Sequence, residues 1–424
     1  MKKPFNNYKT LFLLFLAGLL SSQICAQSLK PGIEANNQLI ELRKDLQGAD
    51  SLMKKGIFKD KDTGREYFTG YAYKTLYDWD QYFEAIVQIY MGWPSDYIKN
   101  GVTIFLDHQE KSGFIARSVP SNQFHGAEHV KPFLAQITML VFDNYNDKKW
   151  FTPEYFKKMQ QYLDYWLNNM DSDKDGLSEW MSAPHTGMDN QHERAGWWLD
   201  RVSEGVDLNS YLVLECKAFA KIAETMGEKT IATTYRNLAE KRANTIREIL
   251  WDKKDGFFYD KSLKTNNIGA HRGVDKLIKV KSIAGFMPLW AGIATKEQAR
   301  ELVYNHLMNP AEFWTNYPVP ALAKTEPGYS DRPLLSDLGC SWRANTWMPT
   351  NYMIYHGLKD YGYSEFASLL AVRTQQMMNK AGNREYYLSE TGEGVGLNPF
   401  WGWSLLGHFF LYEDISKYDI TKTH

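Results

Sequence analysis

The most informative stretch of this chain is Gly187-Met188-Asp189-Asn190-Gln191-His192-Glu193-Arg194, followed after two tryptophans by Val206-Asp207-Leu208-Asn209-Ser210-Tyr211. The first half is polar and aromatic, and it has the period of neither a strand nor a helix, so it predicts a loop. The second half opens an amphipathic helix, because apolar side chains recur on one helical face. These apolar residues are Leu208, Tyr211, Leu212, Phe219, Ile222 and Met226. The stretch therefore predicts a polar loop that leads into a long helix.

The loop carries a carboxylate close to the tryptophan pair Trp197-Trp198. Aromatic faces pack on the apolar side of a sugar ring, and a carboxyl group desolvated by indoles keeps its proton near neutral pH. This combination makes Asp189 a candidate acid for sugar chemistry. Aspartate is also common in loops, so the local pattern leaves open that Asp189 only caps a turn.

Acids and tryptophans meet in three further motifs. Trp79-Asp80-Gln81-Tyr82 stands ahead of an apolar helix, and taken alone Asp80 is better explained as a helix N-cap. Two tryptophans flank an arginine in Trp342-Arg343-Ala344-Asn345-Thr346-Trp347. Near the C-terminal end, Glu385-Tyr386-Tyr387-Leu388-Ser389-Glu390-Thr391-Gly392-Glu393-Gly394 is followed by Phe400-Trp401-Gly402-Trp403-Ser404. The pairing of acids with aromatic residues therefore recurs along most of the chain.

These motifs, in this order, resemble those of glycoside hydrolase family 63 and its trehalase relatives. The resemblance covers nearly the whole chain after residue 26, and it includes Gly113–Pro120 and Lys131–Gln136. The arginine element departs from the family pattern at Ala344 and Asn345, where glycine and proline are usual. Little of the chain lies outside the catalytic motifs, which is similar to mannosylglycerate hydrolases and other compact family members.

The resemblance implies an all-α fold, an (α/α)6 barrel with decorated loops at one rim that form the cleft. It also implies that Asp189 is the general acid and Glu385 the general base of an inverting mechanism. Inversion needs two carboxyl groups roughly 6.5–9.5 Å apart, with room for water between them. Glu385 matches the leading position of its motif, whereas Glu390 and Glu393 are competing acids in the same run. The chemistry requires no metal or other cofactor.

The resemblance also suggests which residues contact the sugar. The candidates are Trp79, Asp80, Gln136, Asn190, Arg194, Trp197, Trp198, Trp342, Arg343, Trp347 and Trp403. Tryptophans from this set would hold the sugar ring and raise the pKa of the acid. The polar members Asp80, Gln136 and Arg343 would fix sugar hydroxyls.

Helical patterns alternate with short loops from residue 36 to residue 415, without a linker or low-complexity break. This layout predicts one all-α domain over residues 27–424. Helices are predicted over 36–54, 207–226 and 229–250, and another begins at Thr152-Pro153, where threonine caps and proline takes the first helical position. Asp255-Gly256 between aromatic residues predicts a short hairpin.

Residues 1–26 predict a cleavable export signal, with a basic start, an apolar run too short for a membrane span, and cleavage near Ala26. We therefore expect a soluble periplasmic or extracellular protein. Ser22-Gln23-Ile24 is a poor lipobox before Cys25, so a lipoprotein is the less expected outcome.

The charge of the chain argues against two classes of partner. Removing a signal with three lysines and no acid takes the formal net charge from −1 to −4. Nothing in this balance indicates nucleic acid or an anionic membrane, so the expected partner is a small carbohydrate. Of the cysteines, Cys216 lies in an apolar helix and is expected to be a buried free thiol. The oligomeric state is not given by the sequence.

Asp171-Ser172-Asp173-Lys174-Asp175-Gly176 resembles the first half of an EF-hand loop. The twelfth position is Ser182 instead of glutamate, so the full motif fails. A tight acidic turn is the default interpretation, and a structural calcium ion on Asp171, Asp173 and Asp175 is the alternative. A second polar group, Glu128 with His125 and His129, is expected to consist of solvated loop residues.

We therefore expect an exported inverting α-glycosidase that hydrolyses α-linked gluco- or manno-configured oligosaccharides or glycosides. One alternative is a polysaccharide lyase on the same toroid, which would use a Tyr/His pair. His185, His192 and Tyr211 keep that alternative open. The other alternative is a non-catalytic sugar-binding protein, which would have no need of two opposed acids.

Overall fold

The computed structural model describes residues 31–70, 74–121, 126–197, 201–263, 276–331 and 340–416. The predicted export signal, His125 and Trp198 lie outside these ranges. Within them, no helix is both long enough and apolar enough to cross a membrane.

Helices dominate the described part of the chain. They are α2 (Pro31–Met53), α3 (Asp78–Tyr90), α4 (Asp96–Asp107), α5 (Leu134–Tyr145), α6 (Pro153–Asn169), α7 (Ala183–Thr186), α8 (His192–Ala195), α9 (Val206–Thr225), α10 (Lys229–Thr245), α11 (Met287–Trp290), α12 (Lys296–Glu301), α13 (Met348–Asp360), α14 (Ser364–Ala381) and α15 (Leu406–Ile415). Short helical turns of other types cover Lys54–Gly56, Ile246–Leu250, Ile283–Phe286, Leu302–Leu307 and Trp403–Leu405.

The strands are short and connect the helices. They are β1 (Ile57–Lys59), β2 (Glu66–Phe68), β3 (Leu76–Tyr77), β4 (Ser118–Val119), β5 (Ser203–Glu204), β6 (Trp251–Asp252), β7 (Phe257–Phe258), β8 (Asp260–Ser262), β9 (Leu277–Ile278), β10 (Asn345–Thr346), β11 (Tyr386–Leu388) and β12 (Gly394–Val395). The predicted hairpin at Asp255-Gly256 is confirmed, because β6 and β7 pair antiparallel around it.

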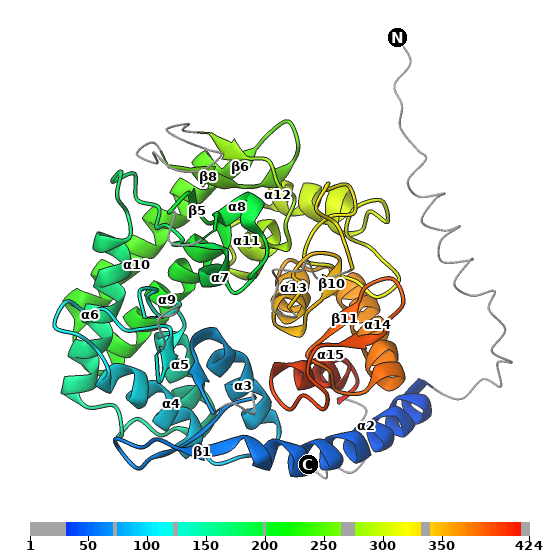
Figure 1. Ribbon diagram of the computed structural model, residues 1–424, viewed down its shortest axis with the longest axis horizontal. Helices are drawn as coiled ribbons and strands as arrows, with labels where there is room; N and C mark the ends of the chain where they lie inside the picture. The colour runs from blue at the N-terminus through cyan, green and yellow to red at the C-terminus, as the bar shows by residue number, and fades with distance from the viewer. Residues whose placement is uncertain are drawn as a thin grey trace, which may run out of the picture.

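The helices form a closed ring. Inner helices pack on one another in chain order, α3 on α5, α5 on α9, α9 on α11, α11 on α13 and α13 on α15, and α15 returns to α3. Outer helices pair with them in hairpins, most extensively α10 with α9 and α14 with α13 and α15. Figure 1 shows the chain running around the ring from α2 in blue to α15 in red. The helix α2 packs on α15 through Leu39, Leu411 and Ile415, so the first and last helices lie side by side.

Sequence features explain the helix boundaries. Thr152 accepts a hydrogen bond from the Tyr155 amide and Pro153 begins α6, as predicted. Thr295 forms a capping box with Gln298 at the start of α12. The helix predicted from Asp207 is α9, which begins at Val206 and is buried along most of its length. The inner position of α9 accounts for this burial.

Aromatic side chains fill the middle of the ring. Phe133 lies 5.1 Å from Tyr82, 5.0 Å from Tyr211 and 6.3 Å from Trp290, measured between ring centroids. These residues come from or adjoin four inner helices, so their packing ties those helices together.

Two small sheets join distant loops. The strands β3 and β4 pair Leu76 with Val119, which places the segment before α3 beside the segment around residue 117. The strands β10, β11 and β12 form a second sheet, in which Thr346 lies opposite Tyr387 and Tyr386 opposite Val395. This second sheet holds the arginine-containing motif against the motif that contains Glu385.

Candidate active site

The turn before Asp189 depends on a glycine. Gly187 ends α7 with a φ of 87°, a conformation that side chains other than glycine rarely adopt. A Cβ atom at this position would lie 2.5 Å from the ring of Trp79. The loop therefore approaches Trp79 as closely as a backbone can, and Asp189 follows two residues later.

Asp189 is partly exposed and lies among other charged groups. Burial raises its pKa to about 6, although the positive charges of Arg117 and Lys131 lower it. The negative charges of Glu128 and Glu385 raise it further. A carboxylic acid with this pKa is protonated in a substantial fraction of molecules near neutral pH, as a general acid requires.

Two buried ion pairs surround the acid. The ammonium group of Lys131 lies 3.0 Å from a carboxylate oxygen of Asp78, and both side chains are buried. The guanidinium group of Arg117 lies 2.8 Å from Glu128 and also donates to the carbonyl oxygen of Pro184 in the acid loop. These pairs fix two cations near Asp189 at positions that the neighbouring backbone determines.

The expectation that Glu128 and His129 are solvated loop residues is wrong. Each is only 1% exposed. Glu128 accepts a hydrogen bond from Ser182 at 2.5 Å, and the imidazole of His129 lies 3.2 Å from the Tyr162 carbonyl oxygen. The sequence motifs around residues 117 and 131 were identified, but the buried charge pairing of Arg117 and Lys131 was not. A lysine and an arginine within otherwise apolar segments are the signal that points to it.

Trp79 and Asp80 lie at the start of α3, next to the acid. Asp80 is 4% exposed and is not the N-cap, which is Tyr77. Burial raises the pKa of Asp80 well above its ordinary value, and the charges of Asp78 and Asp189 add to this effect. Trp79 packs 5.7 Å from Trp342 and 6.4 Å from Trp403, measured between ring centroids. The predicted aromatic residues thus form one cluster.

Glu385 is held by different partners. It is 7% exposed, and one carboxylate oxygen accepts a hydrogen bond of 2.9 Å from the Leu397 amide. The other oxygen lies 3.9 Å from the thiol of Cys340, which donates a weak hydrogen bond. Burial raises the pKa of Glu385, whereas both hydrogen bonds lower it. A Cβ atom on Gly396 would lie 2.4 Å from the carboxylate, so only glycine fits there.

The competing acids have more exposed positions. Glu390 forms an ion pair of 2.7 Å with Lys324, and its side chain is 42% exposed. Glu393 is exposed. Neither is named among the charges that shift the pKa of Asp189, whereas Glu385 is. The geometry therefore favours Glu385 as the partner of Asp189.

The segment from residue 340 to residue 347 links the two carboxylates. At one end, Cys340 contacts Glu385. Further along, the Trp342 amide donates to the side chain of Asn190 at 2.9 Å, and Arg343 donates to the Asn190 backbone carbonyl at 2.8 Å. Arg343 also forms an ion pair of 3.0 Å with Glu193. One segment thus contacts Glu385 and the residue that follows Asp189.

Stacked rings rigidify this segment. Trp342 and Trp347 stack with centroids 3.8 Å apart and an interplanar angle of 8°. Trp347 in turn stacks on Tyr386 at 4.4 Å, next to Glu385 in sequence. The indole N–H of Trp403 donates to the Glu385 backbone carbonyl at 3.3 Å. The aromatic residues therefore brace the backbone on both sides of the base.

Other predicted sugar contacts have structural partners. Arg194 lies 2.8 Å from Asp207 and 2.7 Å from Asp260, in a buried cluster that anchors α8 to α9. The side-chain amide of Gln136 donates to the Pro132 carbonyl at 2.9 Å and to Glu215 at 3.1 Å. These contacts give both side chains a role in holding loops in place.

The tryptophan pair of the acid loop is described only in part. Trp197 is 52% exposed and stacks on His192 with ring centroids 3.5 Å apart. Trp198 lies outside the described residues. An exposed indole in this position is available to a ligand.

The residues that kept a lyase open lie in unsuitable places. His185 and Tyr211 are fully buried, and burial lowers the pKa of His185 to about 4. His192 lies beneath Trp197. This arrangement removes the specific support for a lyase.

The acidic turn has partners as well as unused acceptors. Carboxylate oxygens of Asp171, Asp173 and Asp175 lie within 4.8 Å of one another. The ammonium group of Lys261 lies 2.8 Å from Asp175 and 3.8 Å from Asp173. Both side-chain oxygens of Asp173 and one of Asp171 are buried without a hydrogen-bond partner. These oxygens fit a cation that prefers carboxylate ligands.

The closed ring of helical hairpins with two facing carboxylate motifs defines a toroidal glycoside hydrolase. More specifically, the chain belongs to the family of the mannosylglycerate hydrolase MGH1-like glycoside hydrolase domain, whose model matches residues 73–404. This match confirms the resemblance to family 63 and its relatives.

Known proteins show the same relationship. A mannosylglycerate hydrolase of Thermus thermophilus is 33% identical over 160 residues, which cover 37% of this chain and 33% of that protein. The periplasmic trehalase of Escherichia coli O1:K1 is 22% identical over 405 residues, covering 79% of this chain and 66% of the trehalase. The match therefore spans about a third of the length of the Thermus protein.

Solved structures confirm the predicted (α/α)6 fold. A family 63 mannosylglycerate hydrolase from Thermus thermophilus, in complex with glucose, superposes with a TM-score of 0.68 at 18% identity, covering 87% of this chain and 99% of that one. The neutral trehalase of Saccharomyces cerevisiae gives a TM-score of 0.61 at 19% identity, covering 84% and 76%.

Proposed function

We propose that this protein is an exported inverting α-glycosidase that acts on gluco- or manno-configured α-glycosides. Asp189 protonates the glycosidic oxygen, and Glu385 removes a proton from the attacking water. The observation that carries the proposal is the pair itself. Both carboxylates are desolvated, one segment contacts both motifs, and the charge of Glu385 acts on the pKa of Asp189.

The environment of each carboxylate suits its role. A pKa of about 6 keeps a proton on Asp189 for donation. Burial raises the pKa of Glu385, which makes its carboxylate a stronger base while the backbone amide of Leu397 keeps it oriented. Trp79, Trp342 and Trp403 lie close together beside the acid loop and supply an apolar surface for a sugar ring.

The relatives narrow the substrate. One similar protein is a mannosylglycerate hydrolase, and its structures contain glucose or D-glycerate. Others are trehalases, including a periplasmic one. We therefore propose an α-glucoside or α-mannoside of small size. An export signal over residues 1–26 would bring the enzyme to such compounds outside the cytoplasm.

The test is release of reducing sugar from α-glucosides, α-mannosides and trehalose, with the product anomer followed by proton NMR. We expect the β-anomer to form first with the unmodified protein, and both Asp189→Asn and Glu385→Gln to abolish release. Glu393→Gln is the matched control, because it removes an exposed carboxylate from the same motif. Appearance of the α-anomer first would exclude inversion, and full activity in Asp189→Asn would exclude the acid assignment.

We also propose that the acidic turn binds a structural calcium ion through Asp171, Asp173 and Asp175. Calcium would neutralise the carboxylates that Lys261 contacts only in part. At about 100 times its Kd, a bound ion stabilises a fold by about 2.7 kcal/mol. We expect calcium to raise the Tm relative to EDTA, magnesium to have a smaller effect, and Asp173→Asn to remove the response. An equal Tm in calcium and EDTA would contradict the site.

A further inference from the structure

A pocket of about 540 Å³ lies on α14, beside the turn that connects β11 to β12. Its lining residues are Asn316, Tyr317, Arg373, Gln376, Lys380, Glu390 and Thr391. None of them is among the residues assigned above to catalysis or sugar binding. The pocket is large enough for a small ligand.

The cations of this pocket bind only backbone carbonyl groups. One nitrogen of Arg373 donates to the Thr315 carbonyl at 2.8 Å, and the guanidinium lies 5.3 Å from the Trp314 ring centroid. The ammonium group of Lys380 donates to the Thr391 carbonyl at 2.5 Å. Across the described ranges, no carboxylate oxygen lies within 4 Å of either cation. Burial lowers the pKa of Arg373, and no acid offsets this effect.

The acid of the pocket does not neutralise these cations. Glu390 forms its ion pair with Lys324 at 2.7 Å. The lining therefore keeps an excess of positive charge. Arg373 and Lys380 are seven residues apart on α14, which places them on one helix face roughly 10 Å apart along the axis.

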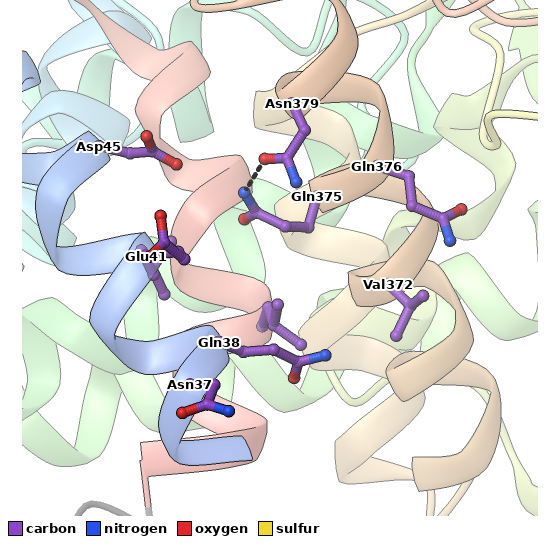
Figure 2. A pocket seen from close by; sticks show the side chains of 10 residues that line it. Asn37, Gln38, Glu41, Asp45, Val372, Gln375, Gln376 and Asn379 are labelled. Carbon is purple, nitrogen blue, oxygen red and sulfur yellow. Dashed lines mark hydrogen bonds between the residues drawn. The ribbon is translucent and has the colours of Figure 1, made fainter. Parts of the chain in front are cut away.

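The groove on the other side of α14 has the opposite character. It measures about 370 Å³ and shares Gln376 with the pocket. Figure 2 shows Glu41 and Asp45 on α2 facing the amides Gln375 and Asn379 on α14, and none of the residues that line this groove is a lysine or an arginine. An anion is therefore attracted to only one side of α14.

We propose that the Arg373–Lys380 pocket is a binding site for an oxyanion, carried by an acidic sugar or present as free phosphate. Arg373 presents the remaining edge of its guanidinium, which matches the two oxygens of a carboxylate or phosphate. Lys380 contributes a second positive charge. The amides of Asn316 and Gln376 and the hydroxyl of Thr391 can both donate to and accept from sugar hydroxyls.

Isothermal titration at low ionic strength tests this site with glucuronate, glucose and inorganic phosphate as probes. We expect glucuronate or phosphate to bind, glucose to lack this component, and added salt to weaken the signal. Lys380→Gln and Arg373→Gln should each weaken binding by about tenfold or more, since each removes a charged hydrogen-bond donor. Lys241→Gln on α10 is the control, because it removes an exposed lysine from a distant helix.

The outcomes separate the two sources of the oxyanion. Tighter binding of glucuronate than of phosphate supports an acidic sugar, and the reverse order supports free phosphate. Lys380→Gln keeps the Arg373 contact with Thr315, so a folded variant remains available if Arg373→Gln is unstable. Binding that is equal in Lys380→Gln, Lys241→Gln and the unmodified protein would overturn the proposal, as would no binding of either anion at about 10 mM.

Discussion

The acid loop and the base motif surround their carboxylates with different chemistry. Asp189 lies near the buried cations Arg117 and Lys131, each of which is already paired with another acid. Glu385 has a backbone amide and a thiol as hydrogen-bond partners, and no cation contributes to its pKa shift. The pKa of the acid therefore reflects a balance of several charges, whereas that of the base depends mainly on burial. Separate controls of this kind allow two carboxyl groups to differ in protonation.

The largest expected effect is on the base. Glu385→Gln should lower kcat by at least about 10³-fold, because general base catalysis contributes about 10²–10⁴-fold and water remains unactivated. The loss should be equally large on an α-glycosyl fluoride, whose leaving group needs no proton. Steady-state kinetics on both substrates measure this, with Glu393→Gln as the control. Activity of the variant on the fluoride would assign the base elsewhere.

The acid should behave differently on the same two substrates. Asp189→Asn should lower kcat on an alkyl glycoside by about 10³-fold, since the leaving oxygen can no longer be protonated. On the α-glycosyl fluoride the loss should be less than about tenfold. The ratio of the two rates measures the effect. An equal loss on both substrates would mean that Asp189 does not act as the acid.

The same acid should cost stability. Its pKa is about 6 in the folded protein and about 3.9 in an unfolded chain, so the folded state holds the proton more tightly. This contribution to the free energy of unfolding is fully present below about pH 4 and is lost as the pH rises to about 6. Asp189→Asn does not ionise and should gain on the order of 2 kcal/mol over the unmodified protein at pH 7.

Urea unfolding at pH 4 and pH 7 measures this difference. The gain should be small at pH 4 and larger at pH 7. Asp62→Asn serves as the control, because it changes an aspartate with an exposed side chain and should show no such trend. A variant that is less stable at both pH values would contradict the assigned pKa.

The smallest expected effect concerns the thiol beside the base. The hydrogen bond from Cys340 lowers the pKa of Glu385, so Cys340→Ala should raise that pKa and move the acidic limb of kcat/KM to higher pH. At the pH optimum the rate should change only about two- to fivefold, because thiol hydrogen bonds are weak. Cys340→Ser keeps a donor and should retain the original profile. An unchanged acidic limb in Cys340→Ala would show that the thiol does not influence the base.

Local sequence features predicted much of this arrangement. The glycine-led loop, the helix α9 and the three aromatic motifs lie close to where the patterns place them, because each depends on neighbours in sequence. Arg194 shows the limit. Its pattern suggested a sugar contact, but its partner Asp260 is 66 residues away and reaches it only through β8.

The same limit applies to the charges near the acid. The ion pair of Lys131 with Asp78 joins positions 53 residues apart, and its burial follows from the packing of α3 beside α5. No local period reveals such a pair. The family resemblance supplied the roles of Asp189 and Glu385, whereas the surroundings that shift their pKa values come only from the three-dimensional arrangement.

The packing of α2 on α15 has a consequence for biosynthesis. The contacts of Leu39 with Leu411 and Ile415 join residues that the ribosome adds almost a whole chain apart. The inner ring likewise closes only when α15 reaches α3. During translation the growing chain can therefore form an open arc of hairpins but not the sealed ring, and its two end surfaces stay uncovered until the last helix is made. A ribosome that stalls before α15 would leave an arc with both apolar ends exposed, which is the form that chaperones and proteases recognise.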